Sequence, residues 1–221
     1  MNSTQNISLK SRRTVKLMLL ANMMESECFE VLRTKEALGY IVSVSRSSYF
    51  GKTNNVDYLV LEVASDHVSA NVLHQRVDLF LTHYFDHVLM PMMGEGESTT
   101  FQLFVNGTVG DLEQKEVRLS QHTALLWSEI KSHQYRFEWK REFVQILRTL
   151  TVREMVAFYK EHVLGQNAKW ISIQIFHQNE GRNNTGFGHQ IIVNQTDEDS
   201  FLYFNDTKEL QRLANAQYYV V

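Results

Sequence analysis

Two histidines one helical turn apart give this sequence its closest approach to a metal site. His83 and His87 stand in the run His-Tyr-Phe-Asp-His, which resembles the H-x-x-E-H pattern that binds zinc with a glutamate as the base. Aspartate has a shorter arm than glutamate and would reach a metal-bound water less well, and no third ligand is signalled. Nine histidines in the chain make such a pair easy to obtain by chance. We therefore expect this pair on a helix surface, and we predict no metal ligands in this chain.

The single cysteine, Cys28, is the other residue that could do chemistry alone. It falls in an amphipathic stretch without an adjacent base, so a small buried apolar side chain is the favoured interpretation. One cysteine also excludes an intramolecular disulfide and any multi-cysteine metal cluster. The phosphate-binding G-x-x-x-x-G-K-[ST] loop, the G-x-G-x-x-G fingerprint and the G-x-S-x-G elbow do not occur, so nucleotide binding and α/β-hydrolase chemistry have no support.

A third candidate is the run from Phe29 to Val42, which contains Arg33 and Tyr40. Residue types alone allow a structural explanation, because basic side chains near a helix C-terminus suit its dipole and an aromatic residue suits the start of a strand. The same residue types also allow chemistry. A guanidinium offers a planar fork of donors to a carbonyl or carboxylate, and a phenol stays protonated at neutral pH and can donate to a developing oxyanion.

The elements that would position these residues alternate between helical and extended patterns. Apolar residues at i, i+3 and i+4 predict helices, and period-two alternation predicts strands. Gly39 is expected to end the first helix, and a turn at 51–55 to join two antiparallel strands. We expect helices over 14–36, 65–89 (capped by Ser65 or Asp66), 99–116 and 117–132, one that begins at the capping box Thr151–Glu154, and a last one capped by Asp206. Strands are expected over 40–45, 56–64 and 170–176. A break is expected at 91–96, and a loop with one short strand over 178–200.

This order of elements predicts an α+β fold, with a mainly antiparallel sheet and helices layered on one face. The hairpin connection and the small number of strands make a parallel βαβ series the less favoured alternative. We treat residues 1–221 as one domain, in which about 178–221 form a less certain tail.

Composition and net charge limit the classes of binding partner that we expect for this chain. The net charge of −3 excludes a general attraction to nucleic acid, and the short basic cluster Lys10, Arg12, Arg13 and Lys16 is better explained as a solvated helix start. No apolar run reaches the roughly 20 residues of a membrane span, so neither nucleic acid nor a membrane is an expected partner. The lone cysteine favours a reducing compartment such as the cytoplasm, whereas sequons keep the secretory pathway open; they lie at Asn2, Asn6, Asn106, Asn183, Asn194 and Asn205.

The run over 28–42 closely resembles a motif of the insulysin or pitrilysin family of zinc metallopeptidases. The family's motif is Cys-Phe-x-x-Leu-Arg-Thr-Lys-Glu-x-Leu-Gly-Tyr-Ile-Val, and this chain matches it almost residue for residue. Similarity continues at 127–130, 134–137, 150–154 and 158–161 and weakens after about Gln178. The order and spacing of these stretches resemble the last domain of that family, and the family's opening strand is missing before the first helix. We therefore expect a piece of a larger, four-domain protein.

The resemblance implies a clamshell in which the first of four similar α+β domains carries H-x-x-E-H and zinc. The last two domains form a metal-free half that closes over a peptide. This chain has Ala21-Asn22-Met23-Met24-Glu25 where the zinc ligands would stand in its first helix. The implied partners are the N-terminal zinc-bearing half of the same protein and a peptide substrate, with a homo-oligomer also possible; zinc is implied for the parent enzyme and no cofactor for this chain.

The resemblance also assigns roles to residues. Arg33 and Tyr40 would contribute to catalysis at the zinc site of the other half, and Phe29 would help to form an apolar substrate pocket. The isolated chain is expected to be inactive, because nothing in it activates water. The alternatives are a non-catalytic structural module that retains the fold and a free-standing peptide-binding domain.

The histidine pair yields the first testable prediction. The purified chain should not bind zinc stoichiometrically, because two helix-surface imidazoles without a third ligand form an incomplete tetrahedral site. Metal content measured by mass spectrometry after dialysis checks this. One equivalent of zinc in the chain that disappears in His83→Ala would overturn the helix-surface interpretation.

Overall fold

The computed structural model describes residues 3–50, 55–94, 99–165, 168–177 and 187–193. None of the helices in these ranges is both long and apolar enough to cross a membrane. In chain order, with η marking π-helical turns, the elements are α1 (Ser3–Cys28), η1 (Phe29–Lys35), β1 (Ile41–Phe50), β2 (Asn55–Ala64), α2 (Ala70–Tyr84), η2 (Phe85–Leu89), α3 (Met90–Met92), α4 (Thr99–Glu113), α5 (Leu119–Lys131), α6 (Trp139–Leu147), α7 (Val152–Tyr159), η3 (Lys160–Leu164), β3 (Ile171–His177) and β4 (Phe187–Val193).

The described strands form two antiparallel hairpins. β1 pairs with β2 from Ile41↔Ala64 to Phe50↔Asn55, and β3 pairs with β4 from Ile171 opposite Val193 onward. The two hairpins are not hydrogen-bonded to each other, so the expected sheet is present as two separate pairs. The predicted antiparallel pairing and the α+β class are confirmed, and β4 is the short strand expected within 178–200.

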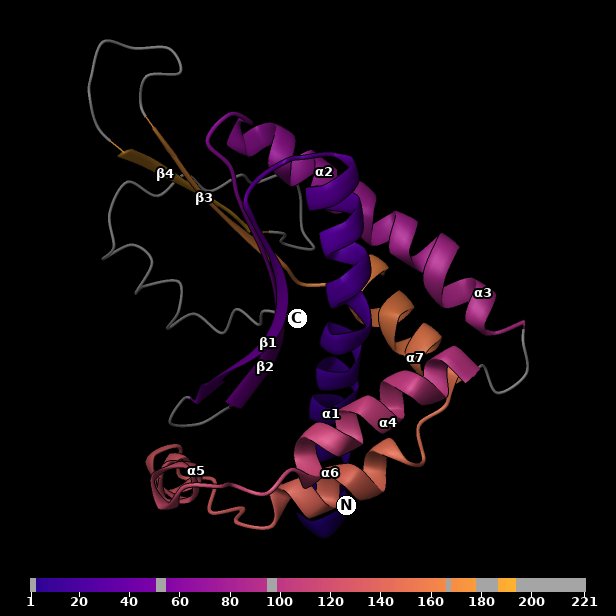
Figure 1. Cartoon of the computed structure of the whole chain (residues 1–221), viewed down its shortest axis with the longest axis vertical. Helices are drawn as coiled ribbons and strands as arrows, with labels where there is room; N and C mark the ends of the chain where they lie inside the picture. Colours follow the sequence, from indigo (N-terminus) through magenta and orange to yellow (C-terminus); the bar gives the residue numbers. More distant parts are fainter. Residues whose placement is uncertain (1–2, 51–54, 95–98, 166–167, 178–186, 194–221) are drawn as a thin grey trace.

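The core is built around α1, which packs against β1, α4 and α6. Leu19, Leu20, Met23 and Met24 of this helix are at most 1% exposed, and each such side chain contributes roughly 1.5–3 kcal/mol through burial. Figure 1 shows α1, α2 and α7 on one side of the β1–β2 hairpin, so the expected helical layer is present. The site residues are attached to the C-terminal end of this central helix, through η1.

The first helix begins well before its predicted start. α1 runs from Ser3 rather than from residue 14, so the basic cluster lies inside the helix and is not a solvated helix start. Arg12 donates to both carboxylate oxygens of Glu154, with Nη2 2.7 Å from Oε1. The guanidinium of Arg12 thereby holds the pKa of Glu154 below its ordinary value, against the opposing effect of burial. The sequence alone did not predict this ion pair, because its two residues are 142 positions apart.

The predicted cap of the α2 helix was wrong. Ser69, in an extended conformation, precedes the first turn of α2, whereas Ser65 accepts hydrogen bonds from the backbone of His67 and Val68 in the preceding turn. The predicted break at 91–96 also begins too early, because Pro91 lies in the first turn of α3, directly after the π-helical η2. A proline needs no partner for a backbone N–H there, and a π turn already interrupts the usual hydrogen-bond ladder.

The later helices differ from the prediction in burial. α5 contributes no buried residue, and Leu119 and Trp127 are 82% and 62% exposed, so its predicted apolar side does not join the core. α6 was not predicted, yet Phe143, Val144 and Leu147 from it are buried. The capping box of α7 is confirmed by reciprocal hydrogen bonds between Thr151 and Glu154. The predicted helix capped by Asp206 lies outside the described residues.

Candidate functional site

Phe29 and Arg33 form one exposed unit on η1. The guanidinium carbon of Arg33 lies 4.7 Å from the centroid of the Phe29 ring, within the range of a cation–π contact. Phe29 is 43% exposed, and Arg33 is exposed as well. Residues four apart share a helix face, and the buried Leu32 anchors the other face of the same turn at 1% exposure. The π-helical turn therefore presents a ring and a cation together to solvent.

Arg33 has no carboxylate within ion-pair distance among the described residues, whereas its neighbour Lys35 lies 3.8 Å from Glu30. That pair is exposed on both sides and contributes little to stability. Of the two basic residues of η1, Lys35 therefore has a carboxylate partner, whereas Arg33 lies against the Phe29 ring and pairs with no carboxylate among the described residues.

Tyr40 lies on a different part of the backbone, next to the first strand. It stands directly before β1, its backbone N–H donates to the Ala64 oxygen at 3.1 Å, and its side chain is 65% exposed. Within the described residues its hydroxyl takes part in no hydrogen bond, and no contact joins it to Arg33. The structure thus brings Phe29 and Arg33 together and places Tyr40 on the adjoining strand end, seven residues further along the chain.

The loop between these two supports ends the helix in an unexpected way. Gly39 was predicted as the helix C-terminal glycine, but the left-handed residue is Ala37, with φ of 50°, a conformation that costs an L-residue about 1–2 kcal/mol. The N–H of Leu38 donates to the Leu32 oxygen at 2.9 Å and closes the turn. Glycine is required at position 39 for another reason, because a Cβ there would lie 2.1 Å from the Ala64 oxygen.

Two further side chains hold this loop, and sequence reasoning missed both. Arg76 on α2 forms an ion pair with both oxygens of Glu36, with Nε 2.7 Å from Oε2, and this partner raises the pKa of Arg76. His67 lies 3.0 Å from the Ala37 oxygen through Nε2. Neither contact has a local sequence signal, because the partners are 40 and 30 residues apart.

The other candidate residues are placed elsewhere. The rings of His83 and His87 are 4.5 Å apart, and His83 lies 3.8 Å from a carboxylate oxygen of Glu27. No group of three His, Cys, Asp or Glu residues suited to a metal occurs within the described ranges. Cys28 is fully buried, and burial raises the pKa of its thiol to about 12, so it is a packed side chain as expected and not a thiolate nucleophile.

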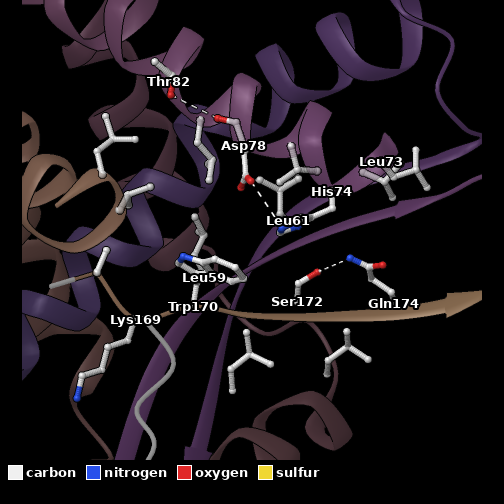
Figure 2. A pocket seen from close by; sticks show the side chains of 18 of the residues that line it. Leu59, Leu61, Leu73, His74, Asp78, Thr82, Lys169, Trp170, Ser172 and Gln174 are labelled. Atoms are coloured by element: carbon white, nitrogen blue, oxygen red, sulfur yellow. Dashed lines mark hydrogen bonds and ion pairs between the residues drawn. The ribbon is translucent and has the colours of Figure 1, made fainter. Parts of the chain in front are cut away.

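The structure also contains a cavity that the sequence did not suggest. It has a volume of about 520 Å³ and lies between β2, α2, η3 and β3. Figure 2 shows His74 and Asp78 on one wall, facing Trp170 and Gln174 across the space. The rings of His74 and Trp170 are 5.4 Å apart, and Nε2 of His74 lies 3.6 Å from Asp78. Apolar side chains of β2 and α2, such as Leu61, complete the lining.

Gln174 gives this cavity a polar group that lacks a partner. Its side chain is 6% exposed, and its Oε1 accepts no hydrogen bond from the described residues, although its amide nitrogen lies 3.5 Å from the Ser172 hydroxyl. A buried acceptor without a donor costs free energy that a bound N–H or O–H group would recover. None of Phe29, Arg33 and Tyr40 lines this cavity.

Comparisons with known proteins agree with the fold and with the motif. Residues 19–127 match the family model described as PQQ synthase PqqF-like, C-terminal lobe domain 4. The chain is 26% identical over 164 residues to the A-factor-processing enzyme of Saccharomyces cerevisiae, covering 74% of this chain and 15% of that protein. It is 30% identical over 145 residues to human insulin-degrading enzyme, covering 66% of this chain and 13% of that enzyme. The crystal structure of pitrilysin superimposes with a TM-score of 0.58 at 18% identity, covering 70% of this chain and 16% of that one.

The helical layer on antiparallel hairpins is thus a pitrilysin-like α+β domain. More specifically, residues 19–127 are similar to a PqqF-like C-terminal lobe domain, and the chain is homologous at partial coverage to metallopeptidases of the insulysin and pitrilysin family. It spans about one seventh of the length of the curated relatives it matches. The matched stretch begins inside α1 and includes η1, the loop at Gly39 and both strands of the first hairpin.

The close approach at Gly39 yields a second prediction. Gly39→Ala should lower the free energy of unfolding by roughly 1–3 kcal/mol, because the new methyl group meets a backbone carbonyl that cannot move aside without disturbing β2. Urea denaturation followed by circular dichroism checks this. Gly107→Ala is the matched control, since nothing lies within 4 Å of a Cβ there and alanine favours the helix. Equal stability of both variants would contradict the packing argument.

Proposed function

We propose that this chain is the last domain of an insulysin-like zinc metalloendopeptidase, where Arg33 and Tyr40 assist peptide hydrolysis at a zinc site in the N-terminal half. The observation that carries the proposal is the exposure of both groups on ordered supports, with no competing partner for either among the described residues. A structural role would be expected to bury or pair at least one of them. The homology of the domain to the C-terminal lobe of this family supports the same role.

Arg33 would bind and orient the substrate. Its guanidinium stays charged at every working pH and can donate two parallel hydrogen bonds to a substrate carbonyl or carboxylate. The cation–π contact with Phe29 limits the rotamers that the long side chain adopts in the free state. Less conformational entropy is then lost when the substrate binds.

Tyr40 would stabilise charge that develops during the reaction. The water-activating chemistry would come from a zinc ion held by residues of the N-terminal half. The phenol hydroxyl of Tyr40 can donate to the carbonyl oxygen as it gains negative charge, and such donors act most strongly when they are fixed in advance. The hydrogen bond from the Tyr40 N–H to the Ala64 oxygen supports this role, because it fixes the backbone from which the phenol projects.

Phe29 would contribute an apolar surface next to these donors. Its ring is 43% exposed even while it supports Arg33, so a substrate side chain could pack against the free part of the ring. Such packing would give the site a preference for apolar residues near the scissile bond. On this proposal the isolated chain binds peptide but does not hydrolyse it, because the water-activating group belongs to the other half.

The third prediction tests Tyr40. In the full-length polypeptide that joins this domain to a zinc-bearing half, Tyr40→Phe should lower kcat by about 10²–10³ with little change in KM, because a transition-state donor is lost while ground-state contacts remain. Steady-state cleavage of a fluorogenic peptide measures both constants. Tyr49→Phe on β1, the strand that follows Tyr40, is a matched control, since Tyr49 is 63% exposed. Unchanged turnover in Tyr40→Phe would remove this residue from the mechanism.

A second candidate function is that of a peptide-binding module without catalysis. The cavity between the two hairpins supports it, because an apolar lining with one unpartnered amide oxygen suits the side chains and N–H groups of an extended peptide. This function would use Gln174 and Trp170 and would not need Arg33. The two candidates therefore place bound peptide on different surfaces of the domain.

The fourth prediction separates these surfaces. Titration of a fluorescently labelled apolar peptide into the purified chain, followed by polarisation, should show weaker binding in Phe29→Ala and unchanged binding in Gln174→Leu. The reason is that the proposed peptidase role places the peptide on η1, outside the cavity. The reverse pattern would favour the peptide-binding module. Circular dichroism of each variant controls for loss of fold.

A further inference from the structure

A histidine outside the motif contacts the loop that separates Arg33 from Tyr40. His67 lies in the turn between β2 and α2, where Ser65 accepts hydrogen bonds from the backbone N–H groups of His67 and Val68 at 3.3 and 3.0 Å. Its Nδ1 is 2.8 Å from Oδ1 of Asp66, and its Nε2 is 3.0 Å from the Ala37 oxygen. One imidazole therefore bridges an acidic side chain and the backbone of the loop.

The geometry of the bridge specifies a protonation state. A carboxylate and a peptide carbonyl are both acceptors, so each ring nitrogen must carry a hydrogen to satisfy its partner. Neutral imidazole has a single N–H and can serve only one of them. At 2.8 and 3.0 Å, both contacts are hydrogen bonds only when the ring is an imidazolium that donates in both directions.

The carbonyl group that accepts this hydrogen bond belongs to a residue with an unfavourable backbone conformation. Ala37 is in the left-handed region, with φ of 50°, and the chain reaches Tyr40 only three residues later. Residues in sparsely populated conformations persist when surrounding contacts fix them. Here the contacts are the Leu38–Leu32 hydrogen bond, the Glu36–Arg76 ion pair and the His67–Ala37 bridge.

We propose that His67 is a positioning residue, whose imidazolium holds the Ala37 carbonyl and so fixes the loop that presents Tyr40 beside η1. The role of Tyr40 in catalysis rests on the function proposed above, whereas the bridge itself is a property of this chain alone. His67 acts through the backbone and does not touch the substrate.

The charged groups around the bridge determine its response to pH. Asp66 adjoins His67 in the same turn. Glu36 follows the last residue of η1, and it is paired with Arg76 of α2. The hydrogen bonds to Asp66 and Ala37 raise the pKa of His67 above 6.5. Because the folded-state pKa is raised, the stabilisation that the two-sided bridge contributes is fully present below pH 6.5 and is lost as the pH rises through the folded-state value, when the single N–H left on the ring can serve only one of the two acceptors.

The fifth prediction follows from this direction. Below pH 6.5, amide hydrogen exchange at Leu38 and Tyr40 should be roughly twofold to fivefold faster in His67→Ala than in the unchanged chain, the size expected for an exposed charge-assisted contact. In the unchanged chain the extra protection should disappear as the pH rises through the His67 titration. Exchange resolved by NMR across pH 5–8, corrected for intrinsic rates, measures both effects.

Two controls make the measurement specific. His122→Ala on α5 removes another exposed histidine with a glutamate neighbour and should leave both amides unchanged. Asp66→Asn should move the His67 titration, followed by its ring nitrogen shifts, to lower pH, and the pH dependence of Tyr40 exchange should move with it. Identical exchange in His67→Ala and the unchanged chain, or exchange that does not follow the His67 titration, would overturn the bridge.

Activity of the full-length polypeptide distinguishes failure of this inference from failure of the proposed function. If Tyr40→Phe lowers kcat and His67→Ala lowers kcat more at pH 6 than at pH 8, the positioning role is supported. If Tyr40→Phe lowers kcat but His67→Ala has no effect at either pH, the positioning role is wrong and the proposed function stands. An unchanged kcat in Tyr40→Phe rejects the proposed function, and with it any catalytic consequence of the bridge.

Discussion

The close approach of Gly39 to the carbonyl group of Ala64 is the constraint on which the rest of the site depends. The backbone after η1 passes so near the end of β2 that no side chain fits between them, and the next amide, of Tyr40, donates to the same carbonyl oxygen. This contact sets the start of the pairing between β1 and β2, in which Ile41 lies opposite Ala64. A helix end and a strand start are thereby joined to one carbonyl group.

The surrounding contacts explain how this junction is maintained without a large local core. Leu32 and Leu38 are buried on the inner side of the loop, and on the outer side Arg76 and His67 reach it from α2 and from the turn before it. Each polar contact is partly exposed and weak by itself. Together they fix a left-handed alanine next to two exposed functional groups, which is the kind of local strain that ordered surroundings sustain.

The comparison between sequence and structure separates local signals from long-range ones. The hairpin at 41–64 and the capping box at Thr151 were predictable because turn residues, alternation and a hydroxyl–carboxylate spacing act within a few residues. The start of α1, the absence of α5 from the core and the burial of α6 were not predictable. They depend on which helix faces pack against distant parts of the chain. Gly39 was recognised as important for the wrong reason, since its role depends on Ala64, 25 positions away in the chain.

The sequence by itself determined the residue types that could act at this site, Phe29, Arg33 and Tyr40, and the α+β class that carries them. The motif consists of residues that are close together in the chain, so it can be identified without coordinates. Tertiary structure alone decided that Arg33 lies on the Phe29 ring, that Tyr40 faces solvent and that His67 contacts the loop between them. The physical reason is that exposure and distant hydrogen bonds arise only when the chain has folded and chosen which groups become neighbours.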